Sequence, residues 1–461
     1  MPHIYALSAN VWYLPGSVSP QAVVECMRKG LERTVQQFPN IAGELEYDDR
    51  DGRMWIRKDK EGGISLYVKS LENDFPSFAE LERKHFPDSM LLASKLLPQF
   101  TSEPGFVKDK SIPTTVFQIN FIRGGMVLGF AIHHVITDGA SGEDLMTTWA
   151  ANSRAALQGQ PFPPLDKNRF DLLKSALEVP KPSPERFEEL KGLFPQHKDA
   201  GGPVLPPPDV QLPKITSMMF HFPRSKAAKL KAVAASKLGG TRISTYDTVV
   251  ALMWQSITRA RLAFLKPDLD APSKVCHAAD SRKIWDPPVL ERFVSCSALV
   301  IETAPLSLRE LIDPANHHLA VAAIRGSITS LSPVWISKLQ ELVAAHHDKR
   351  WIEFQSDSFL GLDVFATSWA GMSTYQKYDF GWGVSRAIRW PSLGVEGFVF
   401  VYPNRSGMEG TGPEEGVETC VCLEEECMQR LIRDPLLREW CAPRGEDGAD
   451  VGVVEAMRSV L

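Results

Sequence analysis

The chain has 461 residues, with 51 basic and 56 acidic side chains, a net charge of -5 and 44% hydrophobic residues. This is the composition of an ordinary globular protein, which excludes a disordered chain and a fibrous repeat. Because no long basic run is interleaved with aromatic residues, nucleic acid is not an expected partner.

The N-terminus and the cysteines indicate a cytoplasmic protein. The first residues lack the basic start and the apolar run of a signal peptide, and no stretch approaches the ~18 apolar residues of a membrane span. The seven cysteines are unevenly spaced and are expected to be reduced thiols.

In chain order, a helix and two strands are predicted first. Ser19-Pro20 precedes apolar residues at helical spacing up to Phe38, which predicts an N-capped helix ended by the following proline. Residues 114–122 and 126–132 are β-rich runs joined by a glycine turn, and this predicts two antiparallel strands.

The segment from His133 to Gly139 follows the second of these strands. Ser141 to Asp144 is expected to provide the N-cap and first turn of another helix. His134 is therefore expected where a strand gives way to a helix. Asp138 could orient its ring or brace the turn, and Gly139 is free to take a left-handed turn.

The chain is expected to divide into two domains, 1–195 and 214–461, joined by a Pro/Gly-rich linker at 196–213. The second domain is predicted to mix helices and strands without a repeat. Its expected helices are 225–237, one opened by Ser244 and continuing past Ile257, and 427–432, and its expected strands are 294–301 and 397–401.

A neutral imidazole can take a proton from an alcohol or amine as it attacks a carbonyl group. Since strand residues alternate faces, only one histidine of the pair is expected to face a cleft. His134 is the candidate base and His133 its inward-facing structural neighbour. The alternative is that both histidines are core residues at the end of a strand.

Other possible sites are weaker. The pairs His317-His318 and His346-His347 lie in polar stretches and are interpreted as solvated surface. Cys420-x-Cys422-x4-Cys427 has no fourth ligand at suitable spacing, so no metal site is predicted. The chain also has no nucleophile elbow, Walker loop or dinucleotide fingerprint.

Two motifs together resemble the signature of the BAHD acyltransferases: His134-x-x-x-Asp138-Gly139 and Asp379-Phe380-Gly381-Trp382-Gly383. The resemblance covers nearly the whole chain and extends to further segments in the family's order. They are Phe38 to Leu45, Ser244-Thr245-x-Asp247, Asp280-x-Arg282, Pro287-Pro288 and Ser368-Trp369. An asparagine often found after the double proline is absent from Phe293 to Cys296. The chain looks closer to fungal branches that acetylate terpenoid alcohols.

The resemblance implies two pseudo-symmetric domains like chloramphenicol acetyltransferase, in a mixed α/β fold with an active-site channel between them. It also implies that His134 deprotonates the acceptor while Asp138 faces away and holds the loop. Asp379 would pair with Arg282 far from the chemistry, with Gly381 and Gly383 in the same structural motif.

Three further features are candidates for binding. Trp382 could line the channel or donate its indole N–H to an oxyanion, although a core tryptophan is an equally good interpretation. Ammonium groups near the start of the helix at 225–237 could bind the phosphates of CoA. The start of the helix opened by Ser244 is a similar candidate. These candidates are Lys226, Lys229 and Lys231, with Ser244 and Thr245; the alternative is a solvated lysine-rich face.

The resemblance thus implies a monomeric enzyme that moves an acyl group, most simply acetyl, from acyl-CoA to a hydroxyl of a small apolar natural product. CoA is a co-substrate in this hypothesis, and no bound cofactor is expected. Two alternatives remain open. One is condensation on a carrier-protein thioester, whose domains share the His-His-x-x-x-Asp-Gly pattern. The other is a non-catalytic protein that binds a metabolite.

Overall fold

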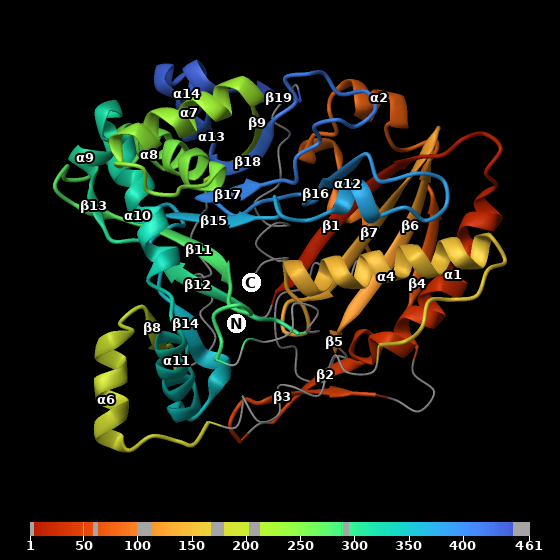
Figure 1. The fold of residues 1–461 in the computed structure, drawn as a ribbon, viewed down its shortest axis with the longest axis horizontal. Coiled ribbons are helices and arrows are strands. Elements are labelled where there is room, and N and C mark those ends of the chain that lie inside the picture. The colour runs from red at the N-terminus through yellow and green to blue at the C-terminus, as the bar shows by residue number, and fades with distance from the viewer. Residues whose placement is uncertain are drawn as a thin grey trace.

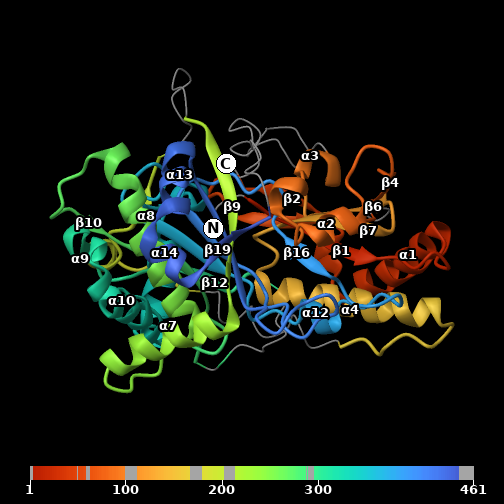
Figure 2. The same ribbon diagram turned by 90° about the horizontal axis from the view of Figure 1, so that it is seen from above.

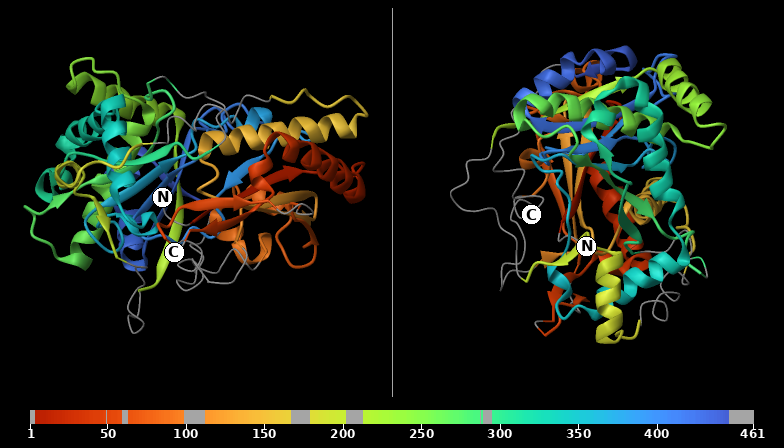
Figure 3. Two further views of the ribbon diagram at one scale, coloured as in Figure 1. Left: turned by 90° about the horizontal axis from the view of Figure 1, so that it is seen from below. Right: turned by 90° about the vertical axis from the view of Figure 1, so that its left-hand side faces the viewer.

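The computed structural model describes residues 4–48, 50–58, 63–98, 112–166, 179–201, 213–286, 288 and 295–445. Within these ranges the chain forms two lobes, each built on a β-sheet, which lie side by side (Figure 1). The left view of Figure 3 shows the same two lobes from below. The predicted mixed α/β fold is confirmed.

The first lobe contains a five-stranded sheet. In spatial order its strands are β16 (Ala387–Arg389), β1 (Tyr5–Tyr13), β7 (Gly125–His133), β6 (Thr115–Ile122) and β4 (Leu66–Ser70). Neighbouring strands are antiparallel, except that β4 and β6 are parallel. The two strands predicted at 114–122 and 126–132 are confirmed as β6 and β7.

Helices cover both faces of this sheet (Figure 2). On one face lie α1 (Pro20–Gln37) and α4 (Gly139–Leu157), and on the other lie α2 (Phe78–Arg83) and α3 (Ala93–Leu96). Because both faces are covered, β6 and β7 are buried along their whole length. This burial explains why these strands are almost continuously apolar.

Local caps start two of the predicted helices. Ser19 Oγ accepts a hydrogen bond from the Ala22 amide at 3.1 Å, at the start of α1. In the second lobe, Ser244 and Asp247 form a reciprocal capping box at the start of α8 (Thr245–Leu265). Such caps satisfy backbone N–H groups that have no partner within the helix. Both helices confirm the predictions made at these positions.

The second lobe contains a seven-stranded sheet. In spatial order its strands are β12 (Ala298–Glu302), β11 (Val275–Asp280), β15 (Val364–Ser368), β17 (Phe398–Val401), β18 (Val417–Glu424), β9 (Ile215–Phe222) and β19 (Ala442–Arg444). Helices that pack over an apolar cluster on one face are α7 (Arg224–Lys237), α8, α10 (His317–Thr329), α13 (Glu425–Arg433) and α14 (Pro435–Trp440). The predicted helices at 225–237 and 427–432 and the strand at 397–401 are confirmed. The strand predicted at 294–301 begins only at Ala298.

Short elements complete the lobes. They are β2 (Glu44–Tyr47), β3 (Met54–Arg57), β5 (Ile112–Pro113), β8 (His197–Asp199), β10 (Pro272–Ser273), β13 (Leu306–Ser307), β14 (Ile352–Phe354), α6 (Pro184–Leu193), α9 (Leu308–Ile312), α11 (Pro333–Ala345) and α12 (Thr374–Lys377). Strand β8 lies inside the predicted linker and pairs with β14. Residues 202–212 of that linker lie outside the described residues.

The second half of the chain returns to the first lobe. Strand β16 pairs with β1, and the Trp12 indole N–H donates to the Tyr378 carbonyl oxygen at 3.0 Å. Arg389 of β16 in turn forms a buried ion pair with Glu418 of β18, at 3.0 Å. The two lobes are therefore joined through β16, and the division at 196–213 stays a prediction.

Among the described residues, no single helix combines the length and apolar composition needed to cross a membrane. One bent pair of segments, Pro314–Thr329 and Pro333–Ala345, meets these two criteria only when taken together.

Candidate active site

His134 lies in a short turn between β7 and α4. Its backbone N–H donates to the Ile4 carbonyl oxygen at 2.8 Å, which continues the pairing of β7 with β1 by one residue. The Ile136 amide then donates to the His133 carbonyl oxygen at 3.0 Å and closes the turn. The predicted position of His134, between a strand and a helix, is confirmed.

The helix that follows begins earlier than predicted. Asp138 is the N-cap of α4, because its carboxylate accepts a hydrogen bond from the Ser141 amide at 3.0 Å. The Ser141 hydroxyl accepts from the Asp138 amide at 3.0 Å in return, so Ser141 is the third helical residue and not the cap. The buried carboxylate holds the end of the turn that carries His134.

Gly139 does not adopt the left-handed conformation that the sequence allowed. Gly139 is the first residue of α4, and its φ is not among the positive values of the described residues. A Cβ there would lie 3.3 Å from Met372 Cε and 3.8 Å from Trp369 Cδ1. Gly139 therefore lies close to the loop after β15, in ordinary helical backbone.

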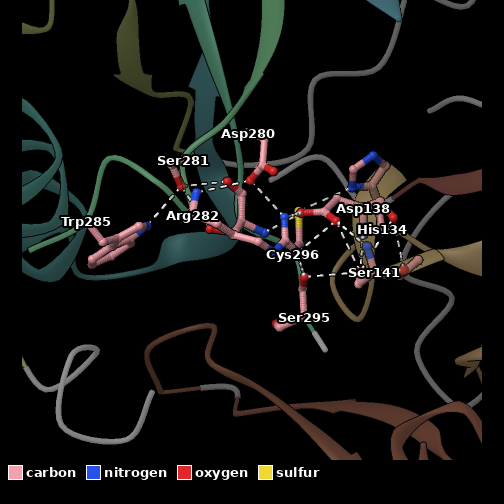
Figure 4. A network of polar contacts seen from close by, with 11 residues as sticks. His134, Asp138, Ser141, Asp280, Ser281, Arg282, Trp285, Ser295 and Cys296 are labelled. Atoms are coloured by element: carbon pink, nitrogen blue, oxygen red, sulfur yellow. Dashed lines mark hydrogen bonds and ion pairs between the residues drawn. The ribbon is translucent and has the colours of Figure 1, made fainter. Parts of the chain in front are cut away.

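The predicted pairing of Arg282 with Asp379 is also wrong, because Arg282 binds Asp138 (Figure 4). Two parallel bonds of 2.9 Å join the guanidinium to the Asp138 carboxylate, and a third of 2.9 Å joins it to Asp280. The Arg282 and Asp138 side chains are only 1% and 3% exposed. This bidentate pair ties the end of β11 in the second lobe to the start of α4 in the first.

Asp379 makes local contacts elsewhere. Its carboxylate accepts hydrogen bonds from the amides of Gly381, at 2.8 Å, and Gly383, at 3.1 Å. Both glycines have positive φ, 121° and 106°. Arg154, in the last turn of α4, donates to the Asp379 carbonyl oxygen at 3.0 Å. The second motif therefore folds a tight loop against the C-terminal end of α4.

This position rules out an oxyanion role for Trp382. Its ring stacks on Phe380 with 6.0 Å between centroids and packs against the apolar cluster under α4. Helix α4 has 19 residues and so spans about 28 Å at 1.5 Å per residue. His134 precedes the start of that helix, whereas an oxyanion donor must lie about 3 Å from the reacting atom.

Replacing Gly381 by alanine should destabilise the protein without changing its chemistry. A Cβ at Gly381 would lie 2.5 Å from Leu157 Cδ2, at a φ that side chains rarely adopt. Backbone strain of this kind costs about 1–3 kcal/mol. We expect Gly381→Ala to lower the denaturation midpoint, while the folded variant keeps wild-type kcat. Gly371→Ala is the control, because nothing lies within 4 Å of its Cβ position.

The two adjacent histidines differ in environment. His133 is buried, contacts Tyr5 edge-on at 5.1 Å, and its Nδ1 accepts from the Val135 amide at 3.3 Å. Burial lowers the pKa of His133 to about 4, so it is neutral at physiological pH. His134 is half-buried, and its Nδ1 lies 3.4 Å from Cys296 Sγ. Burial also lowers the pKa of His134, while the Asp138 charge acts in the opposite direction.

The candidate CoA residues lie in the second lobe. Lys226 and Lys229 are exposed in the first turns of α7. Ser244 caps α8 and its hydroxyl accepts from the Asp247 amide at 3.2 Å, while Thr245 is the first residue of that helix. Helices α7 and α8 pack together. The contacts found in the described residues do not connect these side chains to His134.

The structure also describes one of the other histidine pairs and the three cysteines that were considered as possible sites. His346 is 4% exposed and lies 3.5 Å from Asp199, so its interpretation as solvated surface is wrong. Cys420, Cys422 and Cys427 are buried free thiols. The described part of the chain contains no group of three or more side chains that could hold a metal ion.

The segment before β12 was predicted to be part of a strand, and no role at the site was predicted for it. Ser297 donates its amide to Asp138 at 2.7 Å, and the Ser295 carbonyl oxygen accepts from Arg282 at 2.9 Å. Cys296 lies between them, and its Sγ is 3.4 Å from His134 Nδ1. The only sequence signal was the missing asparagine near this segment.

The chain is similar to known proteins over most of its length. A family model described as the Transferase family matches residues 1–436. Acetyltransferase FGR3 of Gibberella zeae is 27% identical over 443 residues, which cover 93% of this chain and 85% of that protein. Trichothecene 3-O-acetyltransferase TRI101 of Fusarium sporotrichioides is 26% identical over 461 residues, covering 95% of this chain and 92% of that protein.

The fold is also similar to a solved structure. The crystal structure of F. sporotrichioides TRI101 complexed with coenzyme A and T-2 has a TM-score of 0.76 to this chain, at 21% identity. The match covers 96% of each chain. Both lobes are therefore shared with that protein.

Proposed function

Since the chain belongs to the Transferase family, the BAHD acyltransferases, we propose that it moves an acetyl group from acetyl-CoA to a hydroxyl of a small, apolar, terpenoid-like molecule. The observation that carries the proposal is the placement of His134. A half-buried imidazole, with a pKa below its ordinary value because of burial, lies at the junction of the two lobes. The similarity to named acetyltransferases supports acetyl as the group and a natural-product alcohol as the acceptor.

The imidazole serves as a general base through Nε2. Nδ1 of His134 lies 3.4 Å from Cys296 Sγ, so this edge of the ring already has a partner. A proton held on Nδ1 leaves the lone pair of Nε2 available for the acceptor hydroxyl. Because its pKa is lowered, the ring is neutral, and thus competent as a base, throughout the physiological pH range.

The reaction then proceeds by direct transfer. His134 Nε2 takes the hydroxyl proton as the acceptor oxygen bonds to the thioester carbonyl carbon, whose π pair moves onto its oxygen. When the carbonyl re-forms, the carbon–sulfur bond breaks and the departing CoA sulfur takes the proton from the imidazolium. The products are an acetyl ester and free CoA, and His134 is neutral again.

Asp138 supports this reaction without taking part in it. Both of its oxygens are bound to Arg282, and they also accept from the amides of Ser141 and Ser297. A carboxylate with these partners is held away from proton transfer. Its role in the proposal is to fix the turn that presents His134 and to hold the second lobe against it.

CoA is proposed to bind with its phosphates near the starts of α7 and α8, where Lys226, Lys229, Ser244 and Thr245 lie. Removing the two ammonium groups in Lys226→Gln/Lys229→Gln should then raise KM for acetyl-CoA roughly ten-fold, because charge-assisted phosphate contacts are lost. We expect kcat to stay near the wild-type value. Lys29→Gln, an exposed lysine of α1 in the first lobe, is the control and should leave KM unchanged.

The acyl donor separates this proposal from its two alternatives. Steady-state turnover with free acetyl-CoA supports acetyl transfer from CoA, whereas turnover with an acetylated carrier protein alone supports condensation chemistry. The Asp379 to Gly383 motif favours the first. Titration calorimetry that detects no binding of acetyl-CoA or longer acyl-CoA thioesters would favour a metabolite-binding protein without this activity.

A further inference from the structure

The side chain that contacts the Nδ1 edge of His134 comes from the other lobe. Cys296 Sγ lies 3.4 Å from His134 Nδ1, on the segment that leads into β12 (Figure 4). This thiol occupies the place beside the imidazole where many hydrolases and transferases have a carboxylate. The nearest motif carboxylate, Asp138, is instead turned toward Arg282.

The backbone on both sides of Cys296 is held by the same ion pair. Before it, the Ser295 carbonyl oxygen accepts hydrogen bonds from Arg282 Nη2 at 2.9 Å and from the Ser141 hydroxyl at 3.2 Å. After it, the Ser297 amide donates to Asp138 Oδ2 at 2.7 Å. Cys296 is thus clamped between two anchored neighbours, and its side chain is directed at the imidazole.

We propose that Cys296 is a positioning residue for His134, held in place by the Asp138–Arg282 pair, and that its thiol gives the base an uncharged partner at Nδ1. This inference rests on the proposed function, because it assumes that His134 is the base. In this arrangement Asp138 acts on the base indirectly: it orients the loop that supplies the sulfur.

The chemistry of the thiol fits this role. Burial and the nearby Asp138 charge raise the pKa of Cys296 to about 12, so the thiol remains neutral when the enzyme works. A neutral sulfur is a weak hydrogen-bond partner and does not stabilise an imidazolium as a carboxylate would. His134 therefore keeps the low basicity that lets it return its proton to the departing CoA sulfur.

Among the described residues, the Asp138 charge raises the pKa of His134, against the effect of burial. His133 is neutral, since burial lowers its pKa to about 4. Arg282 forms ion pairs with both Asp138 and Asp280. A charge introduced at Cys296 would thus be the nearest to the imidazole and should dominate its titration.

Three substitutions of Cys296 test the proposal through the pH dependence of kcat/KM. Cys296→Asp places a carboxylate beside Nδ1 and should raise the pKa of the acidic limb by about 1–2 units, because an adjacent opposite charge favours the imidazolium. Cys296→Ser keeps a neutral polar atom beside the ring. It should retain the wild-type pKa of the acidic limb and most of kcat. Cys296→Ala removes the contact and should lower kcat roughly ten-fold at unchanged KM for acetyl-CoA, as expected when only the placement of the base is lost.

Cys26→Ala is the matched control, because this buried thiol lies in α1 and bonds to the Val23 carbonyl oxygen. It should leave the pH profile and kcat unchanged. The proposal is overturned if the alanine and serine variants both keep wild-type kcat and pH profile. It is overturned equally if a folded Cys296→Asp variant shows no shift in the pKa of the acidic limb. If that variant does not fold, the alanine and serine variants decide. Retained activity in His134→Ala would instead contradict the proposed function itself.

Discussion

His134→Ala is expected to lower kcat by about 10²–10⁴-fold, the usual contribution of a positioned general base. The loss should appear in kcat and kcat/KM alike, because proton transfer is needed only in the transition state. KM for acetyl-CoA should change little. Initial rates of CoA release, measured over a range of acetyl-CoA and acceptor concentrations, provide the test.

A second histidine provides the control for this experiment. His347 is exposed just after α11. His347→Ala should therefore retain wild-type kcat. His134 is not the base if its alanine variant keeps wild-type turnover with an unchanged circular dichroism spectrum.

Arg282→Met is expected to lower the free energy of unfolding by about 3–5 kcal/mol, because it leaves a buried carboxylate without its counter-charge. Asp138 is 3% exposed in the folded protein, so water cannot replace the guanidinium. The change also frees the Ser295 carbonyl oxygen and loosens the contact between the lobes. Denaturant unfolding followed by tryptophan fluorescence measures the effect, and kcat should fall as well.

Two controls define what this loss means. Arg309→Met breaks the exposed pair with Asp270 and should leave the unfolding midpoint unchanged. The double variant Asp138→Asn/Arg282→Met removes both charges and should recover part of the lost stability, since no charge is then left buried. Equal losses in the single and double Arg282 variants would show that the guanidinium acts by packing alone.

Features set by local sequence could be predicted. The helix at Pro20–Gln37 follows from one cap, one proline and an apolar face. Strand β7 and the turn after it follow from an apolar run that ends at two histidines. His134 could be placed between a strand and a helix for the same reason. Each of these features depends on neighbours within a few positions.

Long-range pairings could not be predicted in this way. Asp138 and Arg282 are 144 positions apart, and the resemblance had assigned Asp379 as the partner of Arg282. Only the fold decides, because the end of β11 meets the start of α4 while Asp379 lies at the other end of that helix. Cys296 was missed for the same reason, since a cysteine in an irregular segment has no local signal of its target.

For residues with two possible roles, the sequence alone could not decide which role they have. Gly139 could serve either backbone freedom or close packing, and the structure shows packing against Met372. Asp138 could orient a ring or brace the turn, and it caps α4. Trp382 could donate a hydrogen bond or fill a core, and it packs, partly buried, against an apolar cluster. For Gly139, the deciding neighbour Met372 is distant in sequence.

Mass spectrometry of a metabolite extract incubated with the protein and acetyl-CoA tests the central claim most directly. We predict that one alcohol gains the mass of a single acetyl group with wild-type protein, and that the same product is lost or greatly reduced with His134→Ala. An equal yield of that product from both proteins would contradict the account, as would the absence of any acetylated product in extracts that contain small apolar alcohols.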